Sequence, residues 1–218
     1  MSAPRLPDAL LAEFGWELAR TESELALELP FFSIEAFNAI YVDSASVDAY
    51  DAIADPRVDL AGRSFFTTDL VFDPSLDSFG VDPASVFGIA TSYAEREFKQ
   101  SIEADGLTAV ETVEERDFDR GDGRPARAFR YEVAYPLSDD VIEQDVVDGQ
   151  FTLESTLWAC IWPTRGAYAM AGGMFPTEEV GDAIHRQATG ARLAVDVEVR
   201  PEPERDRDRT FEAMRRVE

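Results

Sequence analysis

The sequence contains almost no cysteine or histidine, two side chains that often carry catalysis or bind metal ions. Its 218 residues include one cysteine, Cys160, and one histidine, His185. A single cysteine excludes an internal disulfide and a cysteine-rich zinc site. One histidine argues against a zinc hydrolase, and no G-x-S-x-G or P-loop sequence occurs. We therefore expect no catalytic set, no cofactor and no metal, while leaving open whether the protein is an enzyme.

Lysine is almost absent, whereas acidic residues are abundant. Lys99 is the only lysine beside 19 arginines, and 44 acidic residues give a formal net charge of −24. No basic cluster is available to neutralise phosphates, so we expect no nucleic-acid partner. An acidic surface almost without lysine resembles the proteins of extreme halophiles, which makes a salt-rich environment our expectation. An acidic protein of a mesophile is the alternative.

Long apolar runs are missing as well. No segment approaches the roughly 18 uninterrupted apolar residues of a membrane-spanning helix. The nearest stretch, residues 155–176, is interrupted by Pro163, Thr164 and Arg165. The first 15 residues lack the apolar centre of a secretory signal. We therefore expect a cytoplasmic protein without a membrane span.

The apolar patterns that are present predict an α+β domain. Strict alternation, as in residues 22–29 with Leu25, Leu27 and Leu29 on one side, is typical of half-buried strands. Strands are expected at 22–29, 33–42, 63–72, 107–117, 126–135, 150–162, 167–175 and 192–199, and helices at 6–14, 46–54, 83–105 and 177–187. Because hairpins dominate the second half, we expect a mainly antiparallel sheet of about six to eight strands with flanking helices.

The longest expected helix covers about residues 83–105. Asp82 can cap its first turn, and Pro83 suits the first helical position. Glu95 and Lys99 lie on its polar face, and Gly106 can end it. Its apolar stripe consists of Val86, Phe87, Ala90, Tyr93, Ala94 and Phe98.

Residues 200–218 differ in composition from the rest of the chain. They carry six arginines and six acidic residues, so the whole charge excess lies in residues 1–199. We interpret 1–199 as a single α+β domain and 200–218 as a charged, flexible tail. A short helix at 210–217 that docks on a partner through Phe211 and Met214 is the alternative.

Cys160 and His185 are the only pair that could form a thiol–imidazole dyad. A nucleophilic cysteine needs a nearby base and a lowered pKa. Cys160 instead lies between large apolar residues within an expected strand, and His185 lies on an expected helix beside Arg186. We interpret Cys160 as a buried, inert thiol and His185 as a surface residue.

The Cys160 strand is expected to form a tight hairpin with the segment that follows. A loop of residues 163–166 would place Trp162 opposite Ala167 and Cys160 opposite Ala169. Large side chains would then face small ones, as dense packing between strands requires. Both faces are apolar near the turn, so we expect another layer on each of them.

The loop DFDRGDG, residues 117–123, resembles two known motifs without matching either. Asp117, Asp119 and Asp122 have the wrong spacing for an EF-hand, so a plain hairpin tip is favoured over a weak cation site. Gly121, Gly123 and Ala126 form a G-x-G-x-x-A between two strands, whereas dinucleotide binding needs it between a strand and a helix.

Other residue groups have a structural interpretation and a functional one. Neighbouring carboxylates could serve acid–base chemistry, but among 44 acidic residues such pairs are expected as solvated charge. The pairs considered are Asp139–Asp140 and Glu114–Glu115. Several phenylalanines are expected in the core, and some could line a ligand cavity between sheet and helix. These are Phe31, Phe32, Phe65, Phe66 and Phe72.

The order of these segments resembles known families. The succession GWELARTESELALELPFF, LAGRSFFTTDLVF, SVFGIATSYAEREFKQSI and ARAFRYEVAYPL is similar to an uncharacterised halophilic archaeal family known only as a domain of unknown function. The resemblance covers most of residues 8–176. A weaker likeness to the PsbP and Mog1 fold implies a non-catalytic binding or assembly role, without matching any partner-contacting residue.

These observations favour a salt-adapted, non-catalytic binding or interaction module with an unknown protein or small molecule as partner. One alternative is a carboxylate-dependent hydrolase or small-ligand enzyme, assisted by Cys160 or His185. A second is an assembly partner that acts through residues 200–218.

The charge excess predicts that folding depends on salt. At molar salt the screening length falls to about 3 Å, so repulsion between surface carboxylates largely disappears. We expect the far-ultraviolet circular dichroism of the folded protein at about 3 M salt to be lost on dialysis to about 0.05 M. Identical spectra at both concentrations would contradict this expectation.

Overall fold

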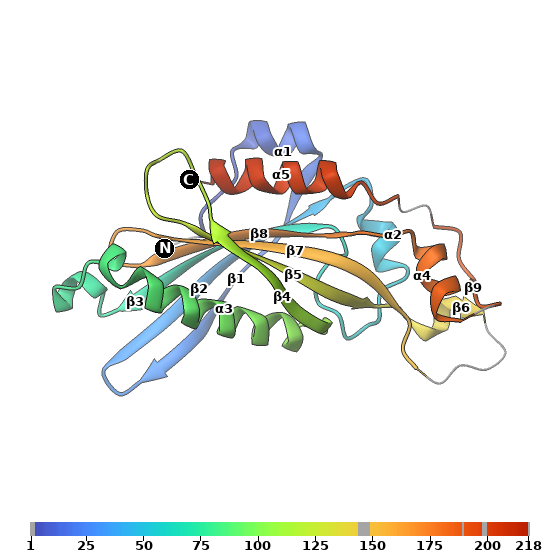
Figure 1. The fold of residues 1–218 in the computed structure, drawn as a ribbon, viewed down its shortest axis with the longest axis horizontal. Coiled ribbons are helices and arrows are strands. Elements are labelled where there is room, and N and C mark those ends of the chain that lie inside the picture. Colours follow the sequence, from blue (N-terminus) through green and yellow to red (C-terminus); the bar gives the residue numbers. More distant parts are fainter. Residues whose placement is uncertain (1–2, 144–148, 189, 198–199, 218) are drawn as a thin grey trace.

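In the computed structural model, which describes residues 3–143, 149–188, 190–197 and 200–217, one large antiparallel sheet forms the centre of the fold (Figure 1). Its strands are β1 (Trp16–Leu29), β2 (Phe32–Asp43), β3 (Ser64–Asp73), β4 (Thr108–Asp117), β5 (Arg127–Pro136), β7 (Thr152–Pro163) and β8 (Tyr168–Pro176). The α-helices are α1 (Asp8–Phe14), α2 (Val47–Asp51), α3 (Phe87–Ala104), α4 (Val180–Gln187) and α5 (Pro203–Arg216). The expected α+β class is confirmed.

The strand order joins an N-terminal meander to a C-terminal one. The seven strands follow the order β1-β2-β3-β8-β7-β5-β4, and every pair is antiparallel. The pairing of β3 with β8 joins the two meanders into one sheet, and the chain between β3 and β4 leaves the sheet to form α3. The strands β1 and β4 are therefore the two edges.

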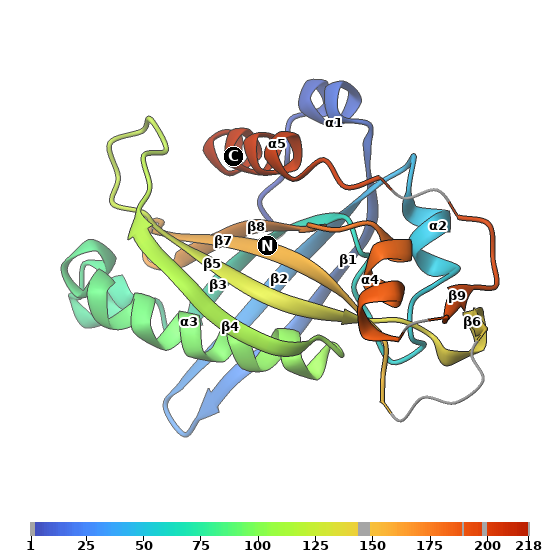
Figure 2. The same cartoon turned by 45° about the vertical axis from the view of Figure 1, so that its right-hand side comes forward.

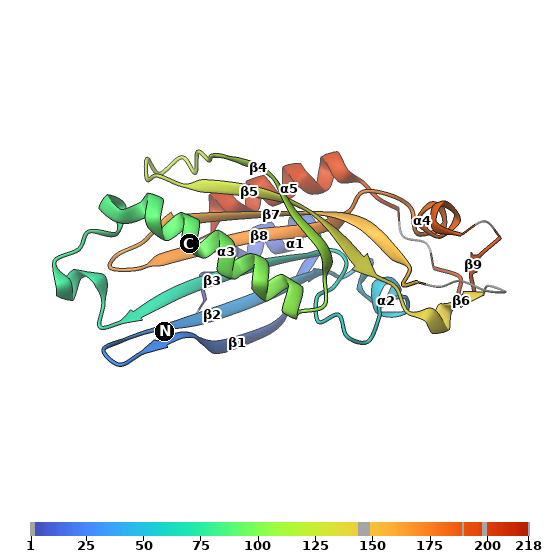
Figure 3. The same cartoon turned by 60° about the horizontal axis from the view of Figure 1, so that its bottom comes forward.

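Helices cover both faces of the sheet. One face packs against α3, and the opposite face packs against α1 and α5 (Figures 1 and 2). Viewed from below, α3 runs obliquely across the strands (Figure 3). Side chains along β7 and β8 alternate between these two apolar layers, so the prediction that both faces of the Cys160 hairpin are covered is confirmed.

Most expected elements are present, although β1 begins at Trp16 instead of at residue 22. Gly15 ends α1 in the left-handed conformation, and the Asp82 carboxylate accepts a hydrogen bond from the Ala84 N–H at 3.1 Å. Pro83–Val86 is a 3₁₀ turn, so the α-helix itself begins at Phe87. The strand expected at 192–199 is reduced to β9 (Arg192–Leu193), which pairs with β6 (Ile142–Glu143); residues 198–199 lie outside the described part.

The register expected for the β7–β8 hairpin is wrong by two residues. Trp162 pairs with Ala169 instead of Ala167, and Cys160 pairs with Ala171. The turn consists of residues 164–167, with Thr164 N–H bonded to the Ala167 carbonyl, and Gly166 supplies the positive φ of 74° within it. Because side chains alternate with a period of two, this shift leaves every residue on its expected face.

The expectation of a flexible tail at residues 200–218 is also wrong for most of that segment. Residues 203–216 form α5, with Ala213 and Met214 fully buried against the sheet. Phe211 makes an edge-to-face contact with Trp158 at a centroid distance of 4.8 Å. The few apolar side chains of α5 are enough to dock this helix, because the sheet presents a complementary aromatic surface.

Two buried arginines hold α5 in place. Arg63 lies between Asp43, at 3.2 Å, and Asp206 of α5, at 3.0 Å. At the other end, Arg120 donates hydrogen bonds to the carbonyl oxygens of Met214 and Val217. The guanidinium thus satisfies carbonyl groups that a helix C-terminus leaves unpaired.

Two adjacent glycines in β8 allow the layers to approach the sheet closely. A Cβ atom on Gly173 would lie 2.8 Å from the Thr210 hydroxyl oxygen of α5. On the other face, a Cβ atom on Gly172 would lie 2.7 Å from the ring of Phe66 and 2.1 Å from the Trp158 carbonyl oxygen.

Truncating a buried α5 side chain tests whether this helix belongs to the folded domain. We expect Met214→Ala to lower the free energy of unfolding by about 2–5 kcal/mol, the usual cost of removing a buried side chain of this size. The control Arg207→Ala, on the exposed side of α5, should change it by less than about 0.5 kcal/mol. Denaturant unfolding at high salt measures both values, and equal stability of the two variants would show that α5 is not docked.

Candidate functional site

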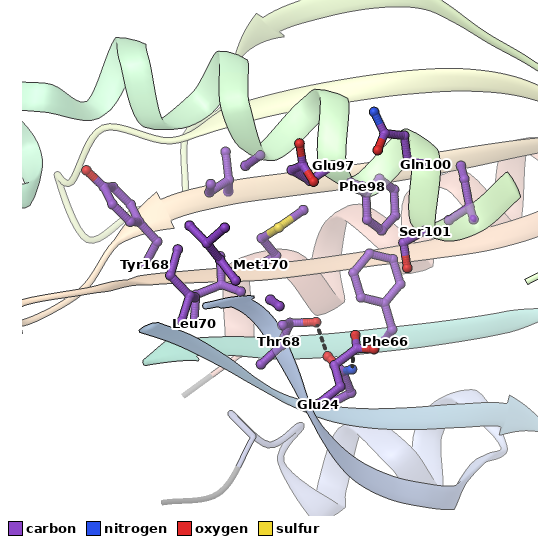
Figure 4. Close-up of a pocket in the computed structure, with 18 of the residues that line it drawn as sticks. Glu24, Phe66, Thr68, Leu70, Glu97, Phe98, Gln100, Ser101, Tyr168 and Met170 are labelled. Carbon is purple, nitrogen blue, oxygen red and sulfur yellow. Dashed lines mark hydrogen bonds between the residues drawn. The ribbon is translucent and has the colours of Figure 1, made fainter. Parts of the chain in front are cut away.

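A cavity of about 780 Å³ lies between α3 and the sheet and is open on one side (Figure 4). Small-molecule pockets typically measure about 300–1,000 Å³, so this volume suits a ligand. Its floor comes from β1, β2, β3 and β8, and its opposite wall comes from α3. Much of the lining is aliphatic or aromatic and includes Ile34, Ile40, Phe66, Leu70, Phe72 and Met170.

Aromatic contacts hold α3 away from the sheet at two points. Phe98 stacks on Phe66 at 5.2 Å, and Phe87 stacks on Tyr168 at 6.4 Å. These phenylalanines are separated by about three helical turns. Between them Ala90 and Ala94 face the cavity with short side chains. The helix is therefore supported at both ends of a segment that cannot itself fill the gap.

A chain of hydrogen-bonded polar side chains crosses the floor of the cavity from β3 to β1, beside Phe66 (Figure 4). The Thr68 hydroxyl donates a hydrogen bond to Asn38 Oδ1 at 2.8 Å, and Asn38 Nδ2 donates to Glu24 Oε1 at 3.4 Å (Figure 4). Both donors are thus directed along one chain that ends at a carboxylate. Glu97 lies on the α3 wall opposite Glu24 (Figure 4).

Among the described residues, Arg20 is the only basic one that lines the cavity. Its guanidinium donates to the Asp59 carboxylate at 2.7 Å and to the Asp59 carbonyl at 3.1 Å, and it lies 3.5 Å from Glu22. Burial raises the pKa of Asp105 above its usual range, and the nearby carboxylates of Asp59 and Glu24 raise it further. This part of the cavity therefore has an excess of negative charge.

Exposed apolar side chains border the open side of the cavity. Ile89 on α3 is 78% exposed, and Leu25 on β1 is 57% exposed. The expectation that Leu25 shares a half-buried side with Leu27 and Leu29 is wrong. A register shift lies between Leu25 and Leu27, and β1 is an edge strand that α3 leaves largely uncovered.

The five phenylalanines considered from the sequence have different positions. Phe32, Phe66 and Phe72 line the cavity. Phe65 is buried on the opposite face, where it stacks on Trp16, and Phe31 is exposed at the β1–β2 turn. The sequence showed that α3 has an apolar stripe, but an apolar stripe does not reveal whether the helix packs completely against the sheet. Only the spacing of large and small residues along it could have indicated a gap.

Cys160 and His185 do not form a dyad. Cys160 is completely buried beneath α5, and burial raises the pKa of its thiol to about 12. The His185 side chain is exposed on α4. The structure therefore supports an inert thiol and a surface histidine.

The aspartate side chains of the loop between β4 and β5 form hydrogen bonds within the loop itself. Asp119 and Asp122 accept hydrogen bonds from the N–H groups of Gly121 and Arg124. Across the described residues, no group of three histidine, cysteine or acidic side chains is placed to hold a metal ion. The loop positions Arg120 at the end of α5.

The carboxylate pairs considered for acid–base chemistry lie outside the cavity. Glu114 lies 3.4 Å from Arg130, and Glu115 lies 3.1 Å from Arg127, both across the β4–β5 pair. Asp139 and Asp140 are exposed in a short 3₁₀ turn. None of these pairs shares a site with the cavity.

The family described as a domain of unknown function, DUF6517, matches residues 3–218. The chain belongs to this family. Comparison with curated proteins and with solved structures gave no match. The DUF6517 match includes α5, so the family extends over the segment that the composition sets apart. In the described part of the chain, no helix is long and apolar enough to cross a membrane.

The burial of Cys160 predicts slow thiol chemistry. Because its pKa is raised to about 12, the thiol should stay protonated at pH 8, and because its side chain is completely buried it should also be inaccessible to reagents. We expect Ellman's reagent to leave the folded protein unlabelled at high salt and to label one thiol completely after unfolding in guanidinium. Rapid labelling under folding conditions would instead identify Cys160 as a reactive residue.

Proposed function

We propose that this DUF6517 protein is a non-catalytic binding protein that holds an elongated apolar ligand between α3 and the sheet. The cavity is the observation that carries the proposal, since it combines about 780 Å³ of space with a mainly apolar lining and a few polar groups. That combination is typical of small-molecule sites. The ligand would enter through the open side between β1 and α3.

The arrangement of the site favours binding over catalysis. The polar groups are carboxylates, an amide and a hydroxyl, held in a chain that ends at Glu24. The single histidine and cysteine lie elsewhere. The carboxylate-dependent enzyme remains an alternative without an observation in its favour, and so does the assembly role suggested by the PsbP and Mog1 likeness.

We also propose that the protein works in concentrated salt in the cytoplasm of a halophile. The net charge of −24 and the single lysine support this proposal. An apolar cavity suits such conditions, because salting-out ions strengthen the burial of apolar surface while they screen repulsion between carboxylates.

Filling the cavity should abolish binding of an apolar probe. N-phenyl-1-naphthylamine is neutral at pH 7 and fluoresces more strongly in apolar surroundings, so we expect saturable enhancement with the folded protein at high salt. Ala94→Trp places a large ring in the gap and should weaken binding by about tenfold or more. Ala94 lines the cavity between the two aromatic supports.

The matched control is Ser92→Trp, which adds the same ring on the exposed side of α3. Circular dichroism should show equal folding of both variants. Unchanged probe binding in Ala94→Trp, or an equal loss in Ser92→Trp, would contradict the cavity as the binding site.

A further inference from the structure

We propose that the ligand is a single-chain amphiphile with a cationic, hydrogen-bond-donating head group, whose apolar tail fills the cavity while its head lies at Glu24. This inference rests on the proposed binding function and specifies the chemistry of its ligand. It is carried by the positions of the polar groups relative to the apolar lining.

The chain of hydrogen bonds from Thr68 to Glu24 ends at a carboxylate that can accept a further hydrogen bond. Thr68 uses its hydroxyl hydrogen on Asn38, and Asn38 uses a side-chain N–H on Glu24. Glu24 is exposed, and its second carboxylate oxygen has no hydrogen bond among those described. A carboxylate can only accept hydrogen bonds, so the group that meets Glu24 must be a donor.

The one cationic side chain that the described part of the chain contributes to the cavity is already paired. Arg20 directs its guanidinium at Asp59 and Glu22, so it does not provide a separate binding point for an anionic head. A fatty-acid carboxylate would meet Glu24 and Glu22 instead, with repulsion that a cation would not experience. Local charge thus favours an ammonium head over a carboxylate one.

The α3 wall adds a second acceptor on the other side of the opening. Glu97 faces the cavity from α3, with one oxygen 3.3 Å from Arg96 (Figure 4). The negative charge of Glu97 adds to that of Glu24 around the opening, which favours a cationic head. The apolar interior beyond them, formed by Leu70, Phe72 and Met170, suits an alkyl chain.

Three decyl amphiphiles with different heads test the charge of the site. Decylammonium, decanoate and decyl maltoside share one tail, and their affinities can be measured by displacement of N-phenyl-1-naphthylamine below their micelle concentrations. The salt concentration is the lowest at which the protein remains folded. We expect decylammonium to bind about tenfold more tightly than the other two, as for one hydrogen bond between charged groups.

The variant Glu24→Gln should remove most of this preference while leaving the affinity for decyl maltoside unchanged. Glu28→Gln is the matched control, because it removes the same charge from the same strand at a position outside the cavity. We expect it to keep the wild-type order of affinities. Equal effects of the two substitutions would show a general response to net charge and would overturn the inference.

The remaining outcomes separate this inference from the proposed function. If decyl maltoside binds and is blocked by Ala94→Trp while decanoate binds as tightly as decylammonium, the cavity binds ligands but the cationic head is wrong. If no decyl compound displaces the probe although Ala94→Trp abolishes probe binding, the amphiphile is wrong and the cavity remains a binding site. If Ala94→Trp also leaves probe binding unchanged, both proposals fail. Tighter binding of phosphatidylcholine vesicles, or of a lysine-bearing amphipathic peptide, than of decylammonium would replace the single-chain ligand with a membrane or a protein partner.

Discussion

Two adjacent glycines, Gly172 and Gly173, set the distance between the sheet and the layers on its two faces. Gly173 leaves room for Thr210, so α5 can lie directly on β8. Gly172 leaves room for the ring of Phe66, which in turn stacks on Phe98 of α3. A side chain at either position would push one layer outward. The central strand of the sheet therefore owes its close contacts on both faces to the absence of two Cβ atoms.

The two faces differ in how completely they are covered. Seven strands spaced about 4.8 Å apart give a sheet about 29 Å wide, whereas one helix is only about 10–12 Å across. The face with α1 and α5 has two helices, whereas on the opposite face α2 and α4 pack toward one end and α3 is the helix that crosses the strands (Figure 2). A single helix cannot cover seven strands, so β1 and β2 extend beyond it. The cavity is the geometric consequence of this mismatch.

The sequence predicts the elements well because their apolar periods are local. Strand alternation and helical stripes depend only on neighbouring residues, and the order of hairpins follows from them. The β7–β8 register was wrong because either four-residue loop, 163–166 or 164–167, pairs the two tryptophans of β7 with small residues. Both loops also contain Gly166, so the local pattern does not choose between them.

The docking of α5 and the cavity could not be predicted in the same way. Met214 and Phe211 form a small apolar surface on their own, and their burial depends on Trp158 and on Arg120, both distant in sequence. The cavity likewise requires knowing that Phe98 meets Phe66. Such contacts join residues that are far apart in the sequence, and local apolar periods carry no information about them. The docking of α5 and the cavity could therefore be identified only from the three-dimensional structure.

The acidic composition and the acidic side of the cavity have different physical meanings. A net charge of −24 spread over the surface acts over a distance that salt controls, and at molar salt this distance is about 3 Å. Under those conditions a remote carboxylate such as Glu28 contributes little to the binding of a charged head group. A carboxylate in direct contact retains its hydrogen bond, because salt screens a contact pair far less than a distant one. High salt would thus screen the general attraction of an acidic surface for cations. In the proposed site, Glu24 and Glu97 would then be the groups that distinguish one head group from another.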